Sequence, residues 1–339
     1  MTEKHEKLTP SNVAKIAERI FALPVEKVTA PGGKSRESLR LHFPGRTIVA
    51  TQRKFSGRMR LEVEVLRRLS EQGAPVPKFL GGSEQIFFQE DVGARRLSGE
   101  LLLAGAQRQT DVAARAFESL LGIHEAGEKS GLADIVPALG AEAGWVKGFV
   151  ASALAASDRF SIAQPEIDVP ELVTRLHVPA RRFLKWDARP GNASIGDDGR
   201  VFWFDWEHCG KRQGVEDFAW LAGDEFWPVG ADDVVAVLRS ILPKDQAEAE
   251  LDYLGLFITF HIVQRLTIIH RRFVKAGWVD TAKALKYDKI GVDPELGKRL
   301  CRHGAGWADR NPLSRPMVVW FENCSGAFDA IVAKAIDNA

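Results

Sequence analysis

This chain of 339 residues has few cysteines and no long uncharged apolar run. Its three cysteines, Cys209, Cys301 and Cys324, are odd in number and far apart, so the sequence predicts neither a disulfide framework nor a close-spaced zinc site. Residues 1–8 are charged and lack the apolar stretch of a secretory signal. No apolar run reaches the roughly 18–20 residues that span a bilayer. We therefore expect a cytoplasmic protein without a membrane segment.

The chain also lacks a surplus of either charge. It carries 46 Lys and Arg against 45 Asp and Glu, a formal net charge of +1. This balance argues against a nucleic-acid binder driven by electrostatic attraction. The balance hides a local excess, because residues 31–60 carry 8 basic and 1 acidic side chains. An excess of this size suits a polyphosphate ligand.

The sequence contains no internal repeat and no low-complexity tract, and 339 residues favour two domains over one. Its hydrophobic periodicity changes along the chain, from alternation typical of strands to a helical pattern. The first part therefore reads as β-rich with one substantial helix, and the second part as mostly helical. The predicted elements are a helix at 11–22 capped by Ser11, a hairpin at 39–51, a helix at 59–72, a strand at 85–89, a hairpin at 193–204 and a helix at 254–275.

Three polar residues around the second hairpin form the most informative pattern. Asp187 is followed five positions later by Asn192, and Asp205 comes directly after the hairpin. Phosphoryl transfer needs such a set, in which one carboxylate orients the acceptor hydroxyl and two oxygen ligands hold magnesium. Asp187 and Asn192 alone could equally cap a helix or shape a turn. The position of Asp205 favours the catalytic interpretation.

The stretch Asp187-Ala-Arg-Pro-Gly-Asn192 with Asp205-Trp-Glu207 resembles the catalytic loop and metal-binding aspartate of the aminoglycoside phosphotransferase and choline kinase-like family, relatives of the protein kinases. The resemblance implies an α+β, two-lobed protein-kinase-like fold, with an N-lobe at 1–91 and a mostly helical C-lobe at 92–339. Further motifs appear in the family's order: Gly32-Gly-Lys-Ser35, Glu62 before Ala74-Pro-Val-Pro77, Phe87-Phe-Gln-Glu-Asp-Val-Gly93, Leu120-Leu-Gly-Ile-His-Glu-Ala126 and Gly214-Val-Glu-Asp-Phe-Ala219.

The same resemblance implies an ATP-dependent kinase that phosphorylates a hydroxyl group of a small molecule. The adenine would lie against the hinge at Glu90 and Val92, and the phosphates under Gly32, Gly33 and Ser35. Magnesium would be held by Asn192 and Asp205, with Asp187 as the base. Two further residues are expected to support the site, His124 as a hydrogen-bonded packing residue and Asp217 as a brace for the catalytic loop.

Several positions depart from the family pattern. Lys185 stands where His is usual and is expected to pair with Asp187, and Trp186 replaces a small residue. Thr51 occupies the place of the phosphate-pairing Lys of the third strand. Either Arg53, two residues on and on the same face, supplies that cation and pairs with Glu62, or the site is weakened. We favour Arg53.

Arg189 stands where small-molecule kinases commonly have His. A cation at this place can neutralise charge on the transferred phosphoryl group, so we expect Arg189 to stabilise the transition state. The alternative is a surface arginine paired with a carboxylate.

The C-terminal part of the sequence offers one clue to the identity of the acceptor. His261, Arg265 and Arg272 lie near one stripe of the predicted helix at 254–275 and are candidate acceptor-binding residues. This stripe suits an anionic acceptor, but a solvated basic face explains it equally well.

Two other functions remain open. A nucleotide-binding pseudokinase that acts as a regulator or scaffold is indicated by Lys185, Trp186 and Thr51. A protein-directed kinase is indicated by Arg189 alone. We expect no nucleic-acid or membrane partner.

Overall fold

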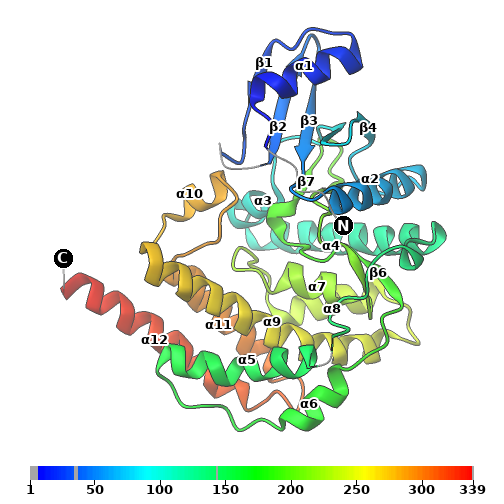
Figure 1. The fold of residues 1–339 in the computed structure, drawn as a ribbon. Helices are drawn as coiled ribbons and strands as arrows, with labels where there is room; N and C mark the ends of the chain where they lie inside the picture. Colours follow the sequence, from blue (N-terminus) through cyan, green and yellow to red (C-terminus); the bar gives the residue numbers. More distant parts are fainter. Residues whose placement is uncertain (1–6, 34–36, 143, 338–339) are drawn as a thin grey trace.

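A five-stranded antiparallel sheet forms the first part of the chain in the computed structural model, which describes residues 7–33, 37–142 and 144–337. The strands lie in the order β1-β2-β3-β5-β4 (Figure 1). β2 and β3 form the predicted hairpin, with Phe43 opposite Arg46. Gly45 turns the chain between them at φ 74°, a conformation that favours glycine. The strands are β1 (Lys27–Thr29), β2 (Ser38–Phe43), β3 (Arg46–Gln52), β4 (Phe79–Gly82) and β5 (Ile86–Glu90).

Helix α1 (Pro10–Phe21) packs on one face of this sheet. Its buried Val13 and Ala17 belong to a small apolar cluster with residues of β2, β3 and β5. The predicted cap at Ser11 is wrong, because Thr9 caps the helix by accepting a hydrogen bond from the backbone N–H of Asn12 at 3.2 Å. Pro10 then occupies the first helical position, where its missing N–H has no cost.

Helix α2 (Ser56–Glu71) corresponds to the predicted helix at 59–72 and begins three residues earlier. Its apolar face does not join the cluster beneath α1. Val65, Leu66 and Leu69 pack instead into the large core that the C-terminal helices share. α2 thus links the sheet to the helical lobe.

The rest of the chain is mostly helical, as predicted, and lies below the sheet in Figure 1. The predicted second hairpin forms between β7 and β8, which pair Ala193 with Trp203. The elements are α3 (Leu97–Leu103), α4 (Ala106–Lys129), η1 (Leu132–Asp134), α5 (Trp145–Phe160), α6 (Val169–Leu176), β6 (Arg182–Leu184), η2 (Pro190–Asn192), β7 (Ala193–Ile195), β8 (Val201–Trp203), β9 (Gly210–Arg212), α7 (Glu216–Ala222), α8 (Ala231–Ile241), α9 (Ala247–Ala276), α10 (Thr281–Lys286), α11 (Pro294–Ala308) and α12 (Met317–Asp337).

Helix α9 is the central helix of this lobe. It is the one helix of the described residues that is long and apolar enough to cross a membrane, but 78% of its most apolar window is buried inside the protein. Its apolar side chains pack against α5, α7 and α11. α9 is therefore explained as the buried core helix of this lobe.

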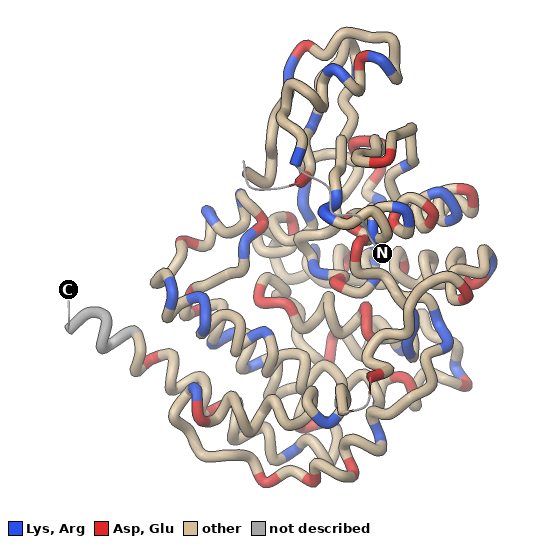
Figure 2. The backbone as a smooth tube through the Cα atoms, viewed as in Figure 1, with Lys and Arg blue, Asp and Glu red and all other residues tan. Residues whose placement is uncertain are grey.

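Basic and acidic residues are interspersed over both lobes, and neither charge dominates the molecule in the view of Figure 2. This distribution agrees with the balanced net charge of +1.

Candidate active site

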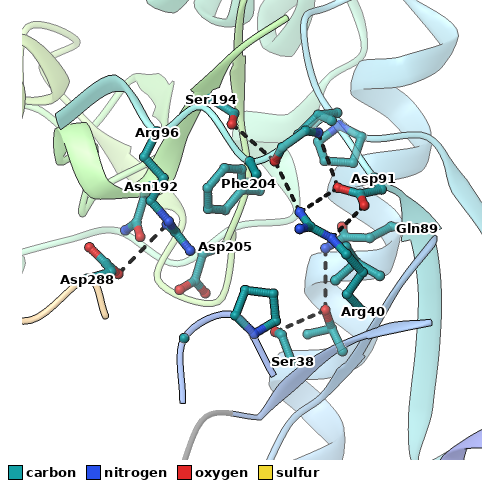
Figure 3. A pocket seen from close by; sticks show the side chains of 18 of the residues that line it. Ser38, Arg40, Gln89, Asp91, Arg96, Asn192, Ser194, Phe204, Asp205 and Asp288 are labelled. Atoms are coloured by element: carbon teal, nitrogen blue, oxygen red, sulfur yellow. Dashed lines mark hydrogen bonds and ion pairs between the residues drawn. The ribbon is translucent and has the colours of Figure 1, made fainter. Parts of the chain in front are cut away.

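A cavity of about 1090 Å³ lies between the sheet and the helical lobe (Figure 3). Strands β2, β3 and β5 line it from one side, and the end of the catalytic loop, Phe204 and α10 from the other. The predicted site residues that line this cleft are Gly32, Arg53, Glu90, Val92, Asn192 and Asp205.

The candidate catalytic loop, residues 185–192, has an unusual backbone that a buried carboxylate holds in place. Trp186 and Asp187 have φ angles of 50° and 49°, which cost residues with a Cβ of the order of 1–3 kcal/mol each. Asp217 accepts hydrogen bonds from the backbone N–H groups of Lys185 and Trp186 at 2.8 and 2.7 Å. His124 contacts the same carboxylate at 2.9 Å through Nε2. The predicted bracing role of Asp217 and packing role of His124 are confirmed.

Both carboxylate oxygens of Asp187 accept hydrogen bonds. Arg189 Nε donates to Oδ1 at 2.9 Å, and Asn192 Nδ2 donates to Oδ2 at 2.9 Å. Nδ2 of Asn192 also donates to the backbone carbonyl of Asp187 at 2.9 Å. Because the amide nitrogen of Asn192 is used here, its carbonyl oxygen is the end left for a cation.

Lys185 does not pair with the Asp187 carboxylate, contrary to the prediction. Its Nζ donates to the backbone carbonyl of Asp205 at 2.8 Å and lies 3.5 Å from that of Asp187. The ammonium also lies 5.2 Å from the ring centre of Trp206, and burial lowers the pKa of Lys185 against the opposing effect of the nearby carboxylates. Lys185 thus ties the catalytic loop to the segment that carries Asp205.

Arg53 joins the two lobes through an ion-pair network. It contacts Glu62 of α2 through Nε at 2.6 Å and Nη2 at 2.8 Å, and it donates from Nη2 to Asp205 Oδ1 at 2.7 Å. Glu62 also accepts a hydrogen bond from the backbone N–H of Trp206 at 3.0 Å. Burial opposes the charge of Arg53, but Glu62 and Asp205 hold its pKa above its ordinary value. The structure therefore brings together the pair that the sequence predicts.

Asn192 and Asp205 fit a magnesium ion by the chemistry of their free oxygens. The backbone N–H of Phe204 donates to the backbone carbonyl of Asn192 at 3.1 Å, so the β7–β8 hairpin places Asn192 opposite the residue that precedes Asp205. Burial opposes ionisation of Asp205, but Arg53 and Lys185 keep its pKa below its ordinary value. No group of three acidic, His or Cys side chains suited to a metal occurs among the described residues. An amide and a carboxylate are therefore the two side chains that could hold a magnesium ion here, a set that would need phosphate and water oxygens to complete it.

The glycine-rich segment lies at the mouth of the cleft. Gly32 lines the cavity, and Gly33 adopts φ 93° after a turn in which its N–H donates to the carbonyl of Ala30 at 2.9 Å. Ser35 lies outside the described residues.

Several cleft residues were not singled out from the sequence. Arg40 of β2 pairs with Asp91, from Nε to Oδ2 at 2.6 Å, and Thr47 donates to the same carboxylate at 2.7 Å. Gln89 of β5 also lines the cleft (Figure 3), and its Nε2 donates at 3.3 Å to the hydroxyl of Thr51, a residue that the sequence had already marked. Alternation along β2, β3 and β5 could have placed them on the cleft side once the hairpin was assigned.

Segment α10 brings the C-terminal part of the chain to the cleft. Asp288 lines the cavity beside Asn192 and lies 3.9 Å from Arg96, whose Nη1 also donates to the carbonyl of Gly191. The ring of Tyr287 lies beside Gly33 of the opposite lobe. No motif marks this segment, so the sequence offered no signal for it.

The three candidate acceptor-binding residues on α9 differ in their burial. His261 is 2% and Arg265 5% exposed, whereas Arg272 is exposed. Arg265 pairs with Glu225 at 2.5 Å and with Asp224 at 3.3 Å. Its charge is therefore already neutralised inside the protein, and Arg272 is the one exposed cation of the three.

A small antiparallel sheet, a helical lobe and a cleft that Asn192 and Asp205 line, with Asp187 hydrogen-bonded to Asn192 beside it, together define the class of kinase-type phosphotransferases. Residues 29–252 match the phosphotransferase enzyme family, and the chain belongs to this family. It is a small-molecule kinase, a phosphotransferase with a hydroxyl group as acceptor.

Solved structures share the fold at low sequence identity. Spectinomycin phosphotransferase in complex with ADP and spectinomycin has a TM-score of 0.54 at 9% identity, over 94% of this chain and 100% of its own. A GDP complex of an aminoglycoside 2'-phosphotransferase IIIa mutant has 0.53 at 14%, over 83% and 97%. An aminoglycoside phosphotransferase from Alicyclobacillus acidocaldarius subsp. acidocaldarius has 0.50 at 15%, over 99% and 98%. No curated protein matches the chain.

Proposed function

We propose that this protein transfers the γ-phosphate of ATP to a hydroxyl group of a small molecule. The observation that carries the proposal is the linked set of Asp187, Asn192 and Asp205. Asn192 donates to the carboxylate of Asp187 at 2.9 Å, and the hairpin that follows it ends at Asp205 in the same cleft.

Asp187 is the base of the proposed reaction. Its carboxylate orients the acceptor hydroxyl and takes its proton as the phosphoryl group moves to the oxygen. Because the transition state of phosphoryl transfer is loose, orientation and charge neutralisation contribute most of the rate. Asn192 and Asp205 would hold Mg²⁺, which when bound neutralises charge on the phosphates.

The N-lobe binds the nucleotide in this proposal. The adenine lies against Glu90 and Val92, and the phosphates lie under Gly32 and Gly33; from the sequence alone, Ser35 is proposed as a further phosphate-binding residue. Arg53 and Glu62 form the ion pair of the nucleotide site. Support comes from the cleft that these described residues line or adjoin, and from relatives whose structures contain ADP or GDP.

Fewer observations support the proposed acceptor and the proposed cellular compartment. The fold's solved relatives include phosphotransferases named for spectinomycin and for aminoglycosides. An anionic acceptor stays a prediction that rests on Arg272, and turnover of cationic acceptors alone would contradict it. Three free, buried cysteines suit a reducing compartment, so we place the enzyme in the cytoplasm.

Two substitutions test the function. Asp187→Asn should lower kcat about 10²–10⁴-fold, because it removes the base and retains the shape. Asp205→Asn should abolish magnesium-dependent ATP turnover, because it removes the proposed carboxylate ligand of the ion, and retention of full activity would contradict the metal assignment. Turnover is measured with radiolabelled ATP over a panel of sugars, amino alcohols and aminoglycosides. The exposed Asp233→Asn serves as the control and should leave both quantities unchanged.

The pseudokinase is the second candidate, favoured by Lys185 and Thr51 in place of the usual residues. Binding of magnesium-ATP in a thermal-shift assay, with no phosphoryl transfer to any acceptor and no slow hydrolysis, would support it. Full activity of Asp187→Asn would contradict the role of Asp187 as the base.

A further inference from the structure

Four of the arginines that line the cleft are already paired with carboxylates. Arg53 is 5% exposed and is shared between Glu62 and Asp205. Thr51 occupies the position where the family pattern has a phosphate-pairing lysine. A phosphate chain in this cleft therefore needs a further cation to pair with its oxygens. The other three pairs are Arg40 with Asp91 at 2.6 Å, Arg95 with Glu100 at 2.7 Å and Arg58 with Glu207 at 3.6 Å.

Arg96, the N-cap residue of α3, reaches the cleft from the helical lobe. Its side chain is 30% exposed. Nη1 donates to the backbone carbonyl of Gly191, the residue before Asn192. The guanidinium carbon lies 5.1 Å from the ring centre of Phe204, the residue before Asp205. The guanidinium thus contacts the chain neighbours of both proposed magnesium ligands (Figure 3).

Asp288 contributes a second acceptor that fixes the direction of Arg96. Its Oδ2 lies 3.9 Å from Nη1 of Arg96, and its side chain is 9% exposed. A Cβ at position 191 would collide with Oδ1 of Asp288, so Gly191 is the residue that admits this carboxylate to the catalytic loop. A guanidinium that is already oriented loses little conformational entropy when it binds an anion.

We propose that Arg96 binds the phosphates of the nucleotide from the helical lobe, in place of the strand lysine that Thr51 replaces. A guanidinium carries five N–H donors in a planar fork that matches the geometry of phosphate oxygens. The phosphates of a magnesium nucleotide lie beside the ligands of the ion, which is where the contacts of Arg96 hold its side chain. The inference rests on the proposed nucleotide site.

The test compares the binding of magnesium-ATP with that of adenosine, which has no phosphate. Glutamine at position 96 retains a donor for the carbonyl of Gly191 but removes the charge. Arg96→Gln should weaken ATP binding about 10- to 100-fold, the range for hydrogen bonds to a charged group, and leave adenosine binding within about twofold. Arg96→Lys should recover part of the loss, because a cation remains.

Two results would overturn the proposal. Unchanged ATP affinity in Arg96→Gln would exclude a contact with the phosphates. An equal loss of affinity for ATP and adenosine would show that Arg96 only holds the shape of the cleft.

Arg95→Gln is the matched control. Arg95 is the preceding residue, lines the same cavity and pairs with Glu100, with 45% of its side chain exposed. The variant removes the same unit charge, but from an exposed position, so it should change ATP affinity less than about threefold. A loss as large as that of Arg96→Gln would attribute the effect to the overall charge of the cleft and contradict a direct contact.

The outcomes separate this inference from the proposed function. Loss of ATP binding in Arg96→Gln, together with no phosphoryl transfer by the parent protein, would support the role of Arg96 and contradict the kinase. Phosphoryl transfer with the same KM for ATP in parent and Arg96→Gln would support the kinase and overturn the role of Arg96. Absence of ATP binding to the parent protein would overturn both.

Discussion

Nearby carboxylates surround Arg189, which contacts the proposed base Asp187. Its Nε contacts Asp187, and the buried carboxylates of Asp224 and Glu225 together with Asp288 add to the negative field around it. Burial opposes its charge, but these carboxylates, led by Asp187, keep its pKa above the ordinary value. In this arrangement the guanidinium orients the base in addition to any charge it offers the phosphoryl group.

Arg189→Ala should therefore lower kcat with little change in the KM for ATP, by about 10²-fold if the base is displaced by 1 Å. Steady-state kinetics with varied ATP measures both constants. Arg189→Lys should restore part of kcat, because a cation remains. Arg200→Ala, which removes an exposed ion pair with Asp198, is the control. An unchanged kcat with a raised KM would contradict the assignment.

Helix α2 shows at the element scale how the sheet and the helical lobe are joined. Its buried Leu66 belongs to the same apolar core as Phe117 of α4, whereas α1 packs on a separate cluster with the sheet. The sequence boundary expected near residue 91 does not coincide with a boundary of the core. The hydrophobic contacts of α2 instead predict that the two lobes unfold together.

Leu66→Ala should destabilise the protein by about 2–5 kcal/mol, because a fully buried leucine leaves a cavity when truncated. Urea denaturation followed by tryptophan fluorescence and by far-ultraviolet circular dichroism should give one coincident transition. All nine tryptophans lie in the helical lobe, so two separated transitions would contradict a shared core. Val319→Ala, at a 59% exposed position, should be close to neutral.

Local patterns predicted much of this architecture. The β2–β3 hairpin followed from alternation around Pro44 and Gly45, and α2 followed from its apolar face. The pairing of Arg53 with Glu62 was also predicted from the sequence. Arg53 shares a strand face with Thr51, and Glu62 shares a helix face with the apolar residues of α2.

What local patterns missed depends on contacts between distant segments. Lys185 turns to the carbonyl of Asp205, twenty positions on, which no spacing rule reveals. Arg265 is neutralised by acids forty positions away, so the stripe that looked free on a helical wheel is buried. Asp288 enters the cleft from the segment that follows α10, which carries no motif.

At the scale of the whole molecule, buried histidines make stability depend on pH. Burial lowers the pKa of His261 to about 3, with Arg265 adding to the effect. An unfolded histidine has a pKa near 6.5. His261 therefore contributes stability that is present above about pH 6.5 and is lost as pH falls toward 3. Asp224, whose pKa burial raises to about 7, contributes the opposite slope between about pH 4 and 7.

The contribution of His261 to stability is measured as the difference between the parent protein and a variant. His261→Gln should remove about 1.4 kcal/mol per pH unit from the slope of unfolding free energy between pH 6 and 4. Urea denaturation of parent and variant at several pH values gives the two slopes. The exposed His208→Gln is the control, and identical slopes for parent and His261→Gln would contradict a buried neutral imidazole.

The network of Arg53 has a kinetic consequence. One guanidinium serves Glu62 of α2 and Asp205 of the helical lobe, and Glu62 also accepts from the backbone of Trp206. If the lobes swing apart, Arg53 and Glu62 stay paired with each other, but Asp205 loses the guanidinium and the backbone N–H of Trp206 loses its acceptor. Under the proposed function, opening of the cleft for nucleotide exchange breaks these two contacts, so their free energy adds to the barrier for exchange.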